Sequence, residues 1–182
     1  MARKIAERLN LDITFEIIGF DSVLAAVESG RIDMAGMGIT DKREEKFNFS
    51  SPFKHSYSTM VVREDDHSGV EKLEDLEGKD AGGAASTVYS EIARKFGAEV
   101  VTYGNAPNEA YLRDVNNGRT DVVINDYYLS KFGVAAFPEF DITLHPELKF
   151  HPTRKGMIMA EGADKLQTEV NQALEDMRED GT

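Results

Sequence analysis

Arg43 is a side chain that could bind an anionic ligand. It lies in the segment 36–46, whose two glycines, Gly36 and Gly38, would let a ligand approach the backbone closely. Thr40 can cap a short helix with Arg43 in its first turn, and an arginine there can bind a carboxylate through two parallel hydrogen bonds. The alternative is a solvated arginine that pairs with one of the two glutamates after it.

Two further positions could bind charged groups. Ser86 and Thr87 follow the small residues 81–85 and begin a helix, and helix N-termini attract anions through their unpaired backbone N–H groups. A simple helix cap is the alternative. Asp126 ends the buried-type strand 121–126, and ligands gather at such strand ends in open α/β sheets. Its carboxylate could bind an ammonium group or cap the helix that follows.

The remaining candidates are weaker. Phe20 follows a predicted strand and begins a helix, where an aromatic ring could stack on a ligand or simply pack into the core. The sequence has no nucleophile elbow, phosphate-binding loop or dinucleotide fingerprint, so it predicts neither a catalytic centre nor a cofactor. Its four histidines lack metal-ligand spacing, so we expect no metal site; they are His55, His67, His145 and His151.

Helices and strands must position these residues. Apolar residues at helical spacing, every three to four positions, alternate along the chain with segments at strand spacing, every second position. In chain order they predict helix 1–9, strand 12–18, helix 20–29, strand 32–36, strand 60–63, a short helix 70–78, helix 87–96, strand 99–103, helix 108–116, strand 121–126, strand 156–160 and helix 163–179. This β-α-β alternation favours parallel sheets covered by helices. Gly-Arg-x-Asp follows a helix at both 30–33 and 118–121, either as a weak internal repeat or as a C-cap glycine with a turn aspartate.

The composition excludes several functions. The 182 residues carry 33 acidic and 21 basic side chains, a net charge of −12, which argues against binding the phosphates of nucleic acids. No apolar run reaches the length of a membrane span. The absence of cysteine excludes disulfides and thiolate chemistry in these residues. The chain opens in one amphipathic helix and closes just past another, so we expect both ends to continue in a longer chain. For this reason the lack of a signal peptide says little about where the protein is located.

The run 19–53 strongly resembles the polar amino-acid binding proteins of ABC importers, the bacterial extracellular solute-binding proteins of family 3. The shared features are an aromatic before the second helix, Gly-x-x-Asp, an Ala-Gly segment leading to Thr-x-x-Arg, and Phe-Ser-x-Pro followed by an aromatic. The likeness continues through 73–79, 118–126 and 155–156, and it covers essentially the whole chain.

The resemblance implies a periplasmic-binding-protein-like α/β fold of type II topology, in which two crossing strands join two α/β lobes. Lobe 1 would contain residues 1–63 and 152–182, and lobe 2 would contain residues 64–151. The family's first strand would precede Met1 and its closing helix would follow Thr182, so both are absent here. Lobe 1 would therefore keep a bare sheet edge unless another segment or chain covers it.

The resemblance also implies a role for each candidate residue. Arg43 would bind the α-carboxylate of an amino acid, and Asp126 would bind its α-ammonium group. The other implied positions are Phe20 for stacking on the ligand side chain, Ala35 and Gly36 for backbone carbonyls near the ammonium group, Gly38 and Gly83 for space, and Thr87 and Val88 for hydrogen bonds to the carboxylate. The family has Thr or Ser at the position of Gly38, so one hydroxyl contact would be lost.

The implied function is that of a receptor, not an enzyme. It would capture a polar amino acid between the lobes and deliver it to ABC permease subunits in the membrane. The resemblance implies a monomer without a cofactor, in the periplasm or lipid-anchored at the extracellular face of the membrane, with a signal segment that these residues lack. Two alternatives on the same fold are a periplasmic dehydratase, which needs a general acid, and a sensor domain followed by a transmembrane segment. A product-release assay with prephenate or arogenate would identify the dehydratase.

Overall fold

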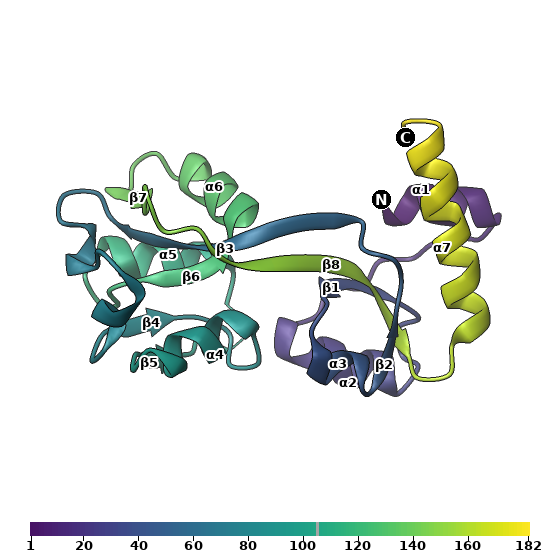
Figure 1. Ribbon diagram of the computed structural model, residues 1–182, viewed down its shortest axis with the longest axis horizontal. Helices are drawn as coiled ribbons and strands as arrows, with labels where there is room; N and C mark the ends of the chain where they lie inside the picture. The colour runs from purple at the N-terminus through teal and green to yellow at the C-terminus, as the bar shows by residue number, and fades with distance from the viewer. Residues whose placement is uncertain (105) are drawn as a thin grey trace. The chain divides into compact units, whose positions relative to one another are not determined.

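The computed structural model describes residues 1–104 and 106–182, and it divides into two compact α/β units (Figure 1). Unit 1 contains residues 1–18, 22–55 and 154–182, and unit 2 contains residues 19–21 and 56–153. No helix in the described ranges combines the length and the hydropathy that a membrane crossing requires.

Unit 1 is built around the C-terminal part of one long strand. Its elements are α1 (Ala2–Leu9), α2 (Val23–Glu28), β1 (Ala35–Gly38), α3 (Asp41–Glu44), β2 (Phe47–Phe49), the end of β8 (Phe150–Ala160) and α7 (Asp164–Glu179). The 3₁₀ turn η1 (Phe20–Ser22) leads into α2. Both β1 and β2 pair with β8 in antiparallel fashion.

Two apolar cores cover opposite faces of β8, because successive side chains on a strand alternate between its faces. Met157 and Met159 pack with α1 and α7, whereas Ile158 packs with α2, β1 and β2. The predicted helix 1–9 is confirmed as α1, which buries Ile5 against α7 and ends at Asn10 in the left-handed conformation. Figure 1 shows α1 lying against α7.

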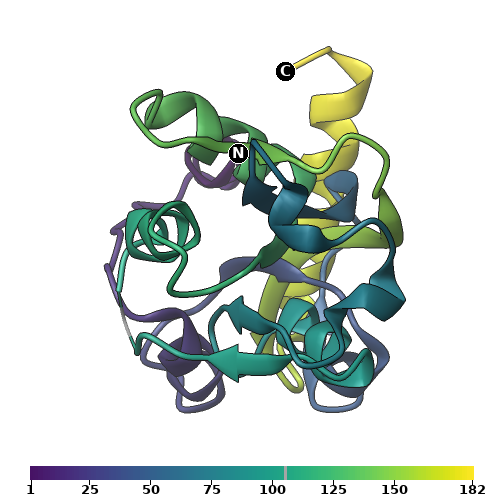
Figure 2. The same ribbon diagram turned by 90° about the vertical axis from the view of Figure 1, so that its left-hand side faces the viewer.

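Unit 2 repeats this arrangement around a second long strand. Its elements are β3 (Lys54–Arg63), the 3₁₀ turns η2 (His67–Gly69) and η3 (Leu73–Leu76), β4 (Asp80–Gly82), α4 (Val88–Lys95), β5 (Glu99–Val101), α5 (Asn108–Asn116), β6 (Val123–Asp126), α6 (Tyr127–Ala136) and β7 (Ile142–Leu144). Met60 and Val62 of β3 face one core, and Val61 faces the other. Strands β6 and β7 pair with β3 in antiparallel fashion, whereas the teal strands β4 and β5 form a parallel pair (Figure 2).

The chain passes between the units within β3, after His55, and within β8, after Thr153. The sequence placed these passages after Arg63 and before residue 152. The polar stretch after Arg63 that suggested the first break instead folds into η2, inside unit 2. Because β3 continues without interruption from Lys54 to Arg63, the passage lies inside a strand, and no break in secondary structure marks it.

Several predicted strands differ from the observed ones, and the predicted strand 12–18 is wrong. Residues 12–18 form no strand or bridge. The predicted strand 32–36 begins only at Ala35, and β8 begins at Phe150 rather than at 156. Parallel pairing is observed between β4 and β5 and at a bridge between Ala81 and Val122, whereas β1, β2, β6 and β7 pair in antiparallel fashion. A strand exists only when a partner accepts its hydrogen bonds, which local periodicity does not report.

Candidate functional site

Arg43 lies on α3, directly after β1, and its side chain turns back to that strand. Its Nη1 donates a hydrogen bond to the backbone oxygen of Gly38 at 2.9 Å. Thr40 is extended and occupies the predicted N-cap position of α3, with Arg43 in the first turn. Its backbone oxygen accepts from the amides of Arg43 and Glu44, whereas its side chain makes no capping hydrogen bond. The guanidinium is therefore held at the end of β1, while Glu44 lies 3.9 Å from Arg154.

The backbone of β1 presents polar groups beside this guanidinium. The amide of Ile39 donates to the oxygen of Arg154 at 2.8 Å, so in this antiparallel ladder the odd-numbered residues of β1 bond to β8. The N–H and C=O groups of Gly36 and Gly38 consequently point to the opposite edge, and β1 ends the hydrogen-bonded order of its sheet. Without a Cβ at either glycine, a ligand could approach these groups closely. Ala35 lies at the start of the same strand.

Thr87 and Val88 form the start of α4 in unit 2. Thr87 is the N-cap residue, and its hydroxyl oxygen accepts from the amide of Ser90 at 3.1 Å. The Ser90 hydroxyl donates to the oxygen of Ala84 at 2.8 Å, which fixes the loop before the helix. The capping alternative is thus observed for the Thr87 side chain. The backbone amide of Val88 is in the first turn, where amides lack intrahelical acceptors and the helix dipole favours an anion.

Gly83 is needed for this loop for steric reasons. A Cβ at position 83 would lie 2.9 Å from the Ser90 hydroxyl oxygen, which is already bonded to Ala84. We therefore expect Gly83→Ala to lower the free energy of unfolding by about 1–3 kcal/mol, measured by urea denaturation. Gly36→Ala is the matched control, because its Cβ would meet only Phe53 at 3.7 Å. Equal denaturation midpoints for the two variants would contradict this packing argument.

Asp126 ends β6 and begins α6, and it is fully buried. Its Oδ1 accepts from the amide of Leu129 at 3.1 Å, so the carboxylate caps the helix. Its own amide donates to the side-chain oxygen of Asn125 at 2.8 Å, and Ser58 of β3 is its partner in the ladder. Asp126 therefore caps α6, which was one of the two predicted alternatives. Its carboxylate lies at the C-terminal end of the buried strand β6, as the sequence predicted.

Phe20 belongs to η1 and is 41% exposed. It is absent from the apolar clusters of the described residues, so the core-packing alternative is not what the structure shows. An exposed aromatic ring is available for stacking on a ligand.

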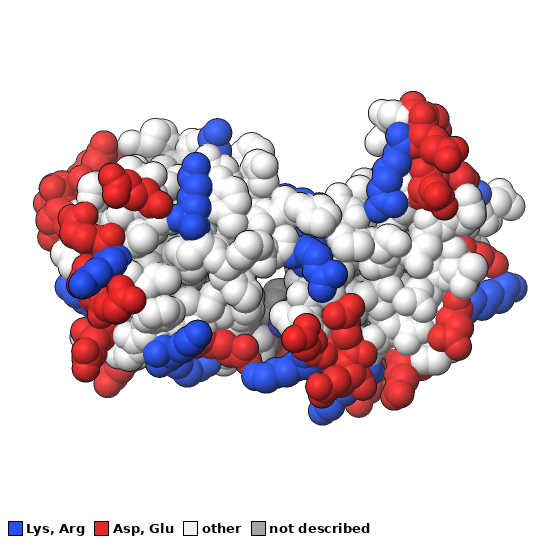
Figure 3. Space-filling view, viewed as in Figure 1, with Lys and Arg blue, Asp and Glu red and all other residues white. Residues whose placement is uncertain are grey.

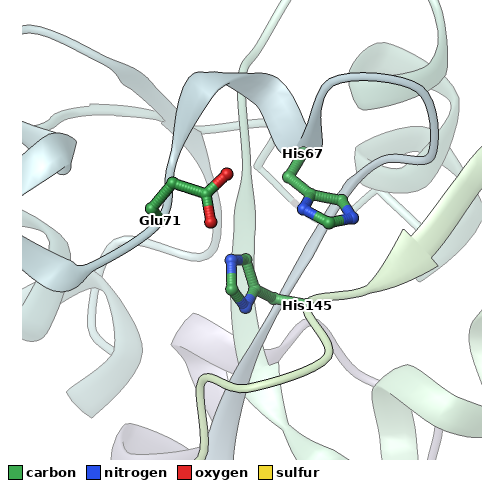
Figure 4. A group of neighbouring side chains, drawn as sticks. All are labelled: His67, Glu71 and His145. Carbon is green, nitrogen blue, oxygen red and sulfur yellow. The ribbon is translucent and has the colours of Figure 1, made fainter.

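The structure brings together three possible metal ligands that the sequence did not connect. The ligand atoms of His67, Glu71 and His145 lie within 4.8 Å of one another, and Figure 4 shows the Glu71 carboxylate directed toward the His145 ring. His67 belongs to η2 and His145 follows β7. Because the two histidines are far apart in the chain, spacing rules could not have found the cluster.

The hydrogen bonds of His145 limit what this cluster can bind. Its Nδ1 accepts from the amides of Glu147 and Leu148, at 3.3 and 3.2 Å, so the ring proton is on Nε2, which lies 2.9 Å from the oxygen of Val70. A metal would need the lone pair of Nε2 and a proton on Nδ1, facing those two amides. The buried imidazole thus connects two loops of unit 2, and a metal ion could bind only if these hydrogen bonds rearranged.

Tyr103, beside β5, forms a part-buried hydrogen bond within unit 2. Burial and the hydrogen bond that its hydroxyl donates to Asp114, at 2.7 Å, raise the pKa of Tyr103 to about 12. The hydroxyl therefore stays protonated at neutral pH and links Tyr103 to α5. On the face shown in Figure 3, acidic side chains are prominent on both units, in agreement with the net charge of −12.

Two α/β units connected by two strands define the class of periplasmic binding proteins, and solved structures share this fold. An ancestral arginine-binding protein bound to glutamine matches the whole chain at a TM-score of 0.90 with 30% identity, and the chain covers 80% of it. The crystal structure of YckB from Bacillus subtilis is 51% identical and matches 98% of the chain at a TM-score of 0.73, with 72% of that structure covered.

The chain belongs to the bacterial extracellular solute-binding proteins, family 3, whose family model matches residues 1–182. The probable ABC transporter extracellular-binding protein YckB of Bacillus subtilis is 52% identical over 160 residues, which are 87% of this chain and 56% of that protein. The L-cystine-binding protein TcyJ of Escherichia coli is 28% identical over 185 residues, and the chain covers 68% of it. This chain thus spans little more than half the length of YckB.

The family match places the chain among solute-binding proteins, whose members are extracellular or periplasmic. Several of its relatives are named as amino-acid-binding proteins of ABC transporters. The predicted family and fold class are confirmed.

Proposed function

We propose that this protein binds a polar amino acid and delivers it to the permease of an ABC importer. The observation that carries the proposal is a pair of opposite charges, each anchored at the end of a strand in its own unit. The Arg43 guanidinium is bonded to the Gly38 oxygen at the end of β1, and the Asp126 carboxylate is buried at the end of β6. A zwitterion needs one fixed cation and one fixed anion, and these residues supply both.

In this proposal Arg43 binds the α-carboxylate and Asp126 binds the α-ammonium group. The first-turn amide of Val88, next to the N-cap residue Thr87, adds a donor to the carboxylate. The Thr87 amide itself donates to the oxygen of Ala84.

The outward-facing carbonyl of Gly36 adds an acceptor for the ammonium group. The carbonyl of Ala35, an odd-numbered residue of β1, faces β8, so the acceptor role expected of Ala35 is not part of this proposal. The exposed ring of Phe20 and the bare backbone of Gly38 beside Arg43 accommodate the ligand side chain. The space expected at Gly83 is filled by the Ser90 hydroxyl, so Gly83 shapes the loop instead.

The relatives' names support the ligand class without selecting one ligand. L-cystine is named for TcyJ, and arginine and glutamine are named for the ancestral protein. All three are polar amino acids, which favours hydrogen-bonding over apolar side chains as ligands. We further propose that the full-length protein works either in the periplasm or lipid-anchored at the extracellular face of the membrane.

A thermal-shift panel of the proteinogenic amino acids and L-cystine tests this function. A ligand at about 100 times its dissociation constant should add about 2.7 kcal/mol to the free energy of unfolding and so raise the melting temperature. The matching deaminated acids serve as controls and should have little effect. The proposal fails if no amino acid shifts the melting temperature, or if prephenate or arogenate is converted to product.

A further inference from the structure

Asp21 is an acidic residue of unit 2 that has no role in the site proposed above. It is the second residue of η1, directly after Phe20, and residues 19–21 belong to unit 2. Its Oδ1 accepts hydrogen bonds from the hydroxyl of Ser86 at 2.6 Å and from the amide of Ser86 at 3.3 Å. These two bonds attach the turn that carries Phe20 to the loop before α4.

The negative charge of Asp21 is not neutralised by this contact. The hydroxyl and the amide of Ser86 are neutral donors, which stabilise a carboxylate without cancelling its charge. Within the residues that the structure describes, Asp21 forms no salt bridge. Its charge also acts on α5, because burial and, to a smaller extent, the Asp21 carboxylate raise the pKa of Tyr111. Asp21 therefore adds a negative potential beside the start of α4.

This charge is next to the groups that bind the ligand in the proposed function. Phe20, whose ring stacks on the ligand side chain there, precedes Asp21 in the chain, and Ser86 precedes the N-cap residue Thr87 of α4. Charges at a protein surface act on one another over a Debye length, about 8 Å at physiological ionic strength. A ligand side chain on the Phe20 ring comes within that range of the Asp21 carboxylate. An acidic side chain would be repelled there, and a basic side chain would be attracted.

We propose that Asp21 determines specificity by excluding acidic ligands, so that the protein binds neutral or basic polar amino acids in preference to aspartate and glutamate. The physical reason is that like charges placed near each other in a binding site lower affinity for the wrong ligand. This inference rests on the proposed amino-acid site, and it narrows the class of ligand that the site accepts.

Two pairs of ligands with similar shape and different charge test the proposal: glutamine with glutamate, and arginine with citrulline. Asp21→Asn removes the charge but keeps a side-chain oxygen for Ser86, so the turn should stay in place. Calorimetry gives the affinities, and weak ligands are measured by competition against the best amino acid of the thermal-shift panel. The parent should prefer glutamine over glutamate by at least about tenfold. Asp21→Asn should reduce this preference by at least about threefold and weaken arginine relative to citrulline.

Two further variants separate the charge from the hydrogen bonds. Glu139→Gln removes an exposed negative charge elsewhere in unit 2 and should leave both ratios as in the parent. Asp21→Ala should change the ratios as Asp21→Asn does and also weaken all four ligands, because the turn at Phe20 loses its attachment. Equal affinities of the parent for glutamine and glutamate, or parental ratios in Asp21→Asn, would overturn this inference alone. A parent that binds no amino acid would overturn the proposed function as well.

Discussion

Arg43→Ala is expected to weaken binding of the amino acid by about 2–5 kcal/mol, which is a loss of affinity of between about 30-fold and a few thousand-fold. The reason is that a ligand carboxylate which leaves water needs a charged partner, and the guanidinium held at Gly38 is that partner in the proposed site. Isothermal titration calorimetry of the parent and the variant, with the amino acid found in the thermal-shift panel, measures the loss.

Two further variants separate charge from geometry. Arg43→Lys keeps the positive charge but loses the planar fork, so it should recover only part of the affinity. Arg154→Ala removes an exposed arginine of the same unit, near Glu44, and should bind like the parent. If Arg43→Ala binds within threefold of the parent, Arg43 is a surface charge and the proposed carboxylate role is wrong.

Asp126→Asn is expected to reduce the discrimination between an amino acid and its deaminated analogue. In the parent, the deaminated acid would leave the buried carboxylate without an ammonium partner, and a site built for a polar group can reject such an analogue by up to about 10⁴-fold. The variant removes the negative charge, so its affinity for the amino acid should fall and the gap to the analogue should narrow. Calorimetric titration of both proteins with both compounds gives the ratio.

The capping role of Asp126 makes this substitution informative. Asparagine is as good an N-cap as aspartate, so Asp126→Asn should keep the hydrogen bond to Leu129 and leave stability nearly unchanged. Asp126→Ala loses the cap as well and should cost about 1 kcal/mol of unfolding free energy. If Asp126→Asn discriminates as sharply as the parent, Asp126 is only a helix cap and another group binds the ammonium.

The sequence alone determined the features that depend on neighbours along the chain. The helix 1–9, the turn into α4 at Thr87 and the strand that ends at Asp126 follow from local periodicity and capping residues, which act within a few positions. The family was also readable from the sequence, because the run 19–53 resembles its motif, and the family model covers residues 1–182. The roles of Arg43 and Asp126 stay predictions.

Only the tertiary structure decided which strands have partners and which side chains meet. Residues 12–18 have the pattern of a strand but do not form one, since strand hydrogen bonds need a second segment beside them. Pairing between strands also determines that β8 begins at Phe150. In the pairing of β1 with β8, the backbone amides of Gly36 and Gly38 point away from β8. His67 and His145 meet across a loop of the fold, and Arg43 bonds to Gly38 rather than remaining in solvent. All of these features depend on contacts between segments, and local sequence patterns carry no information about such contacts.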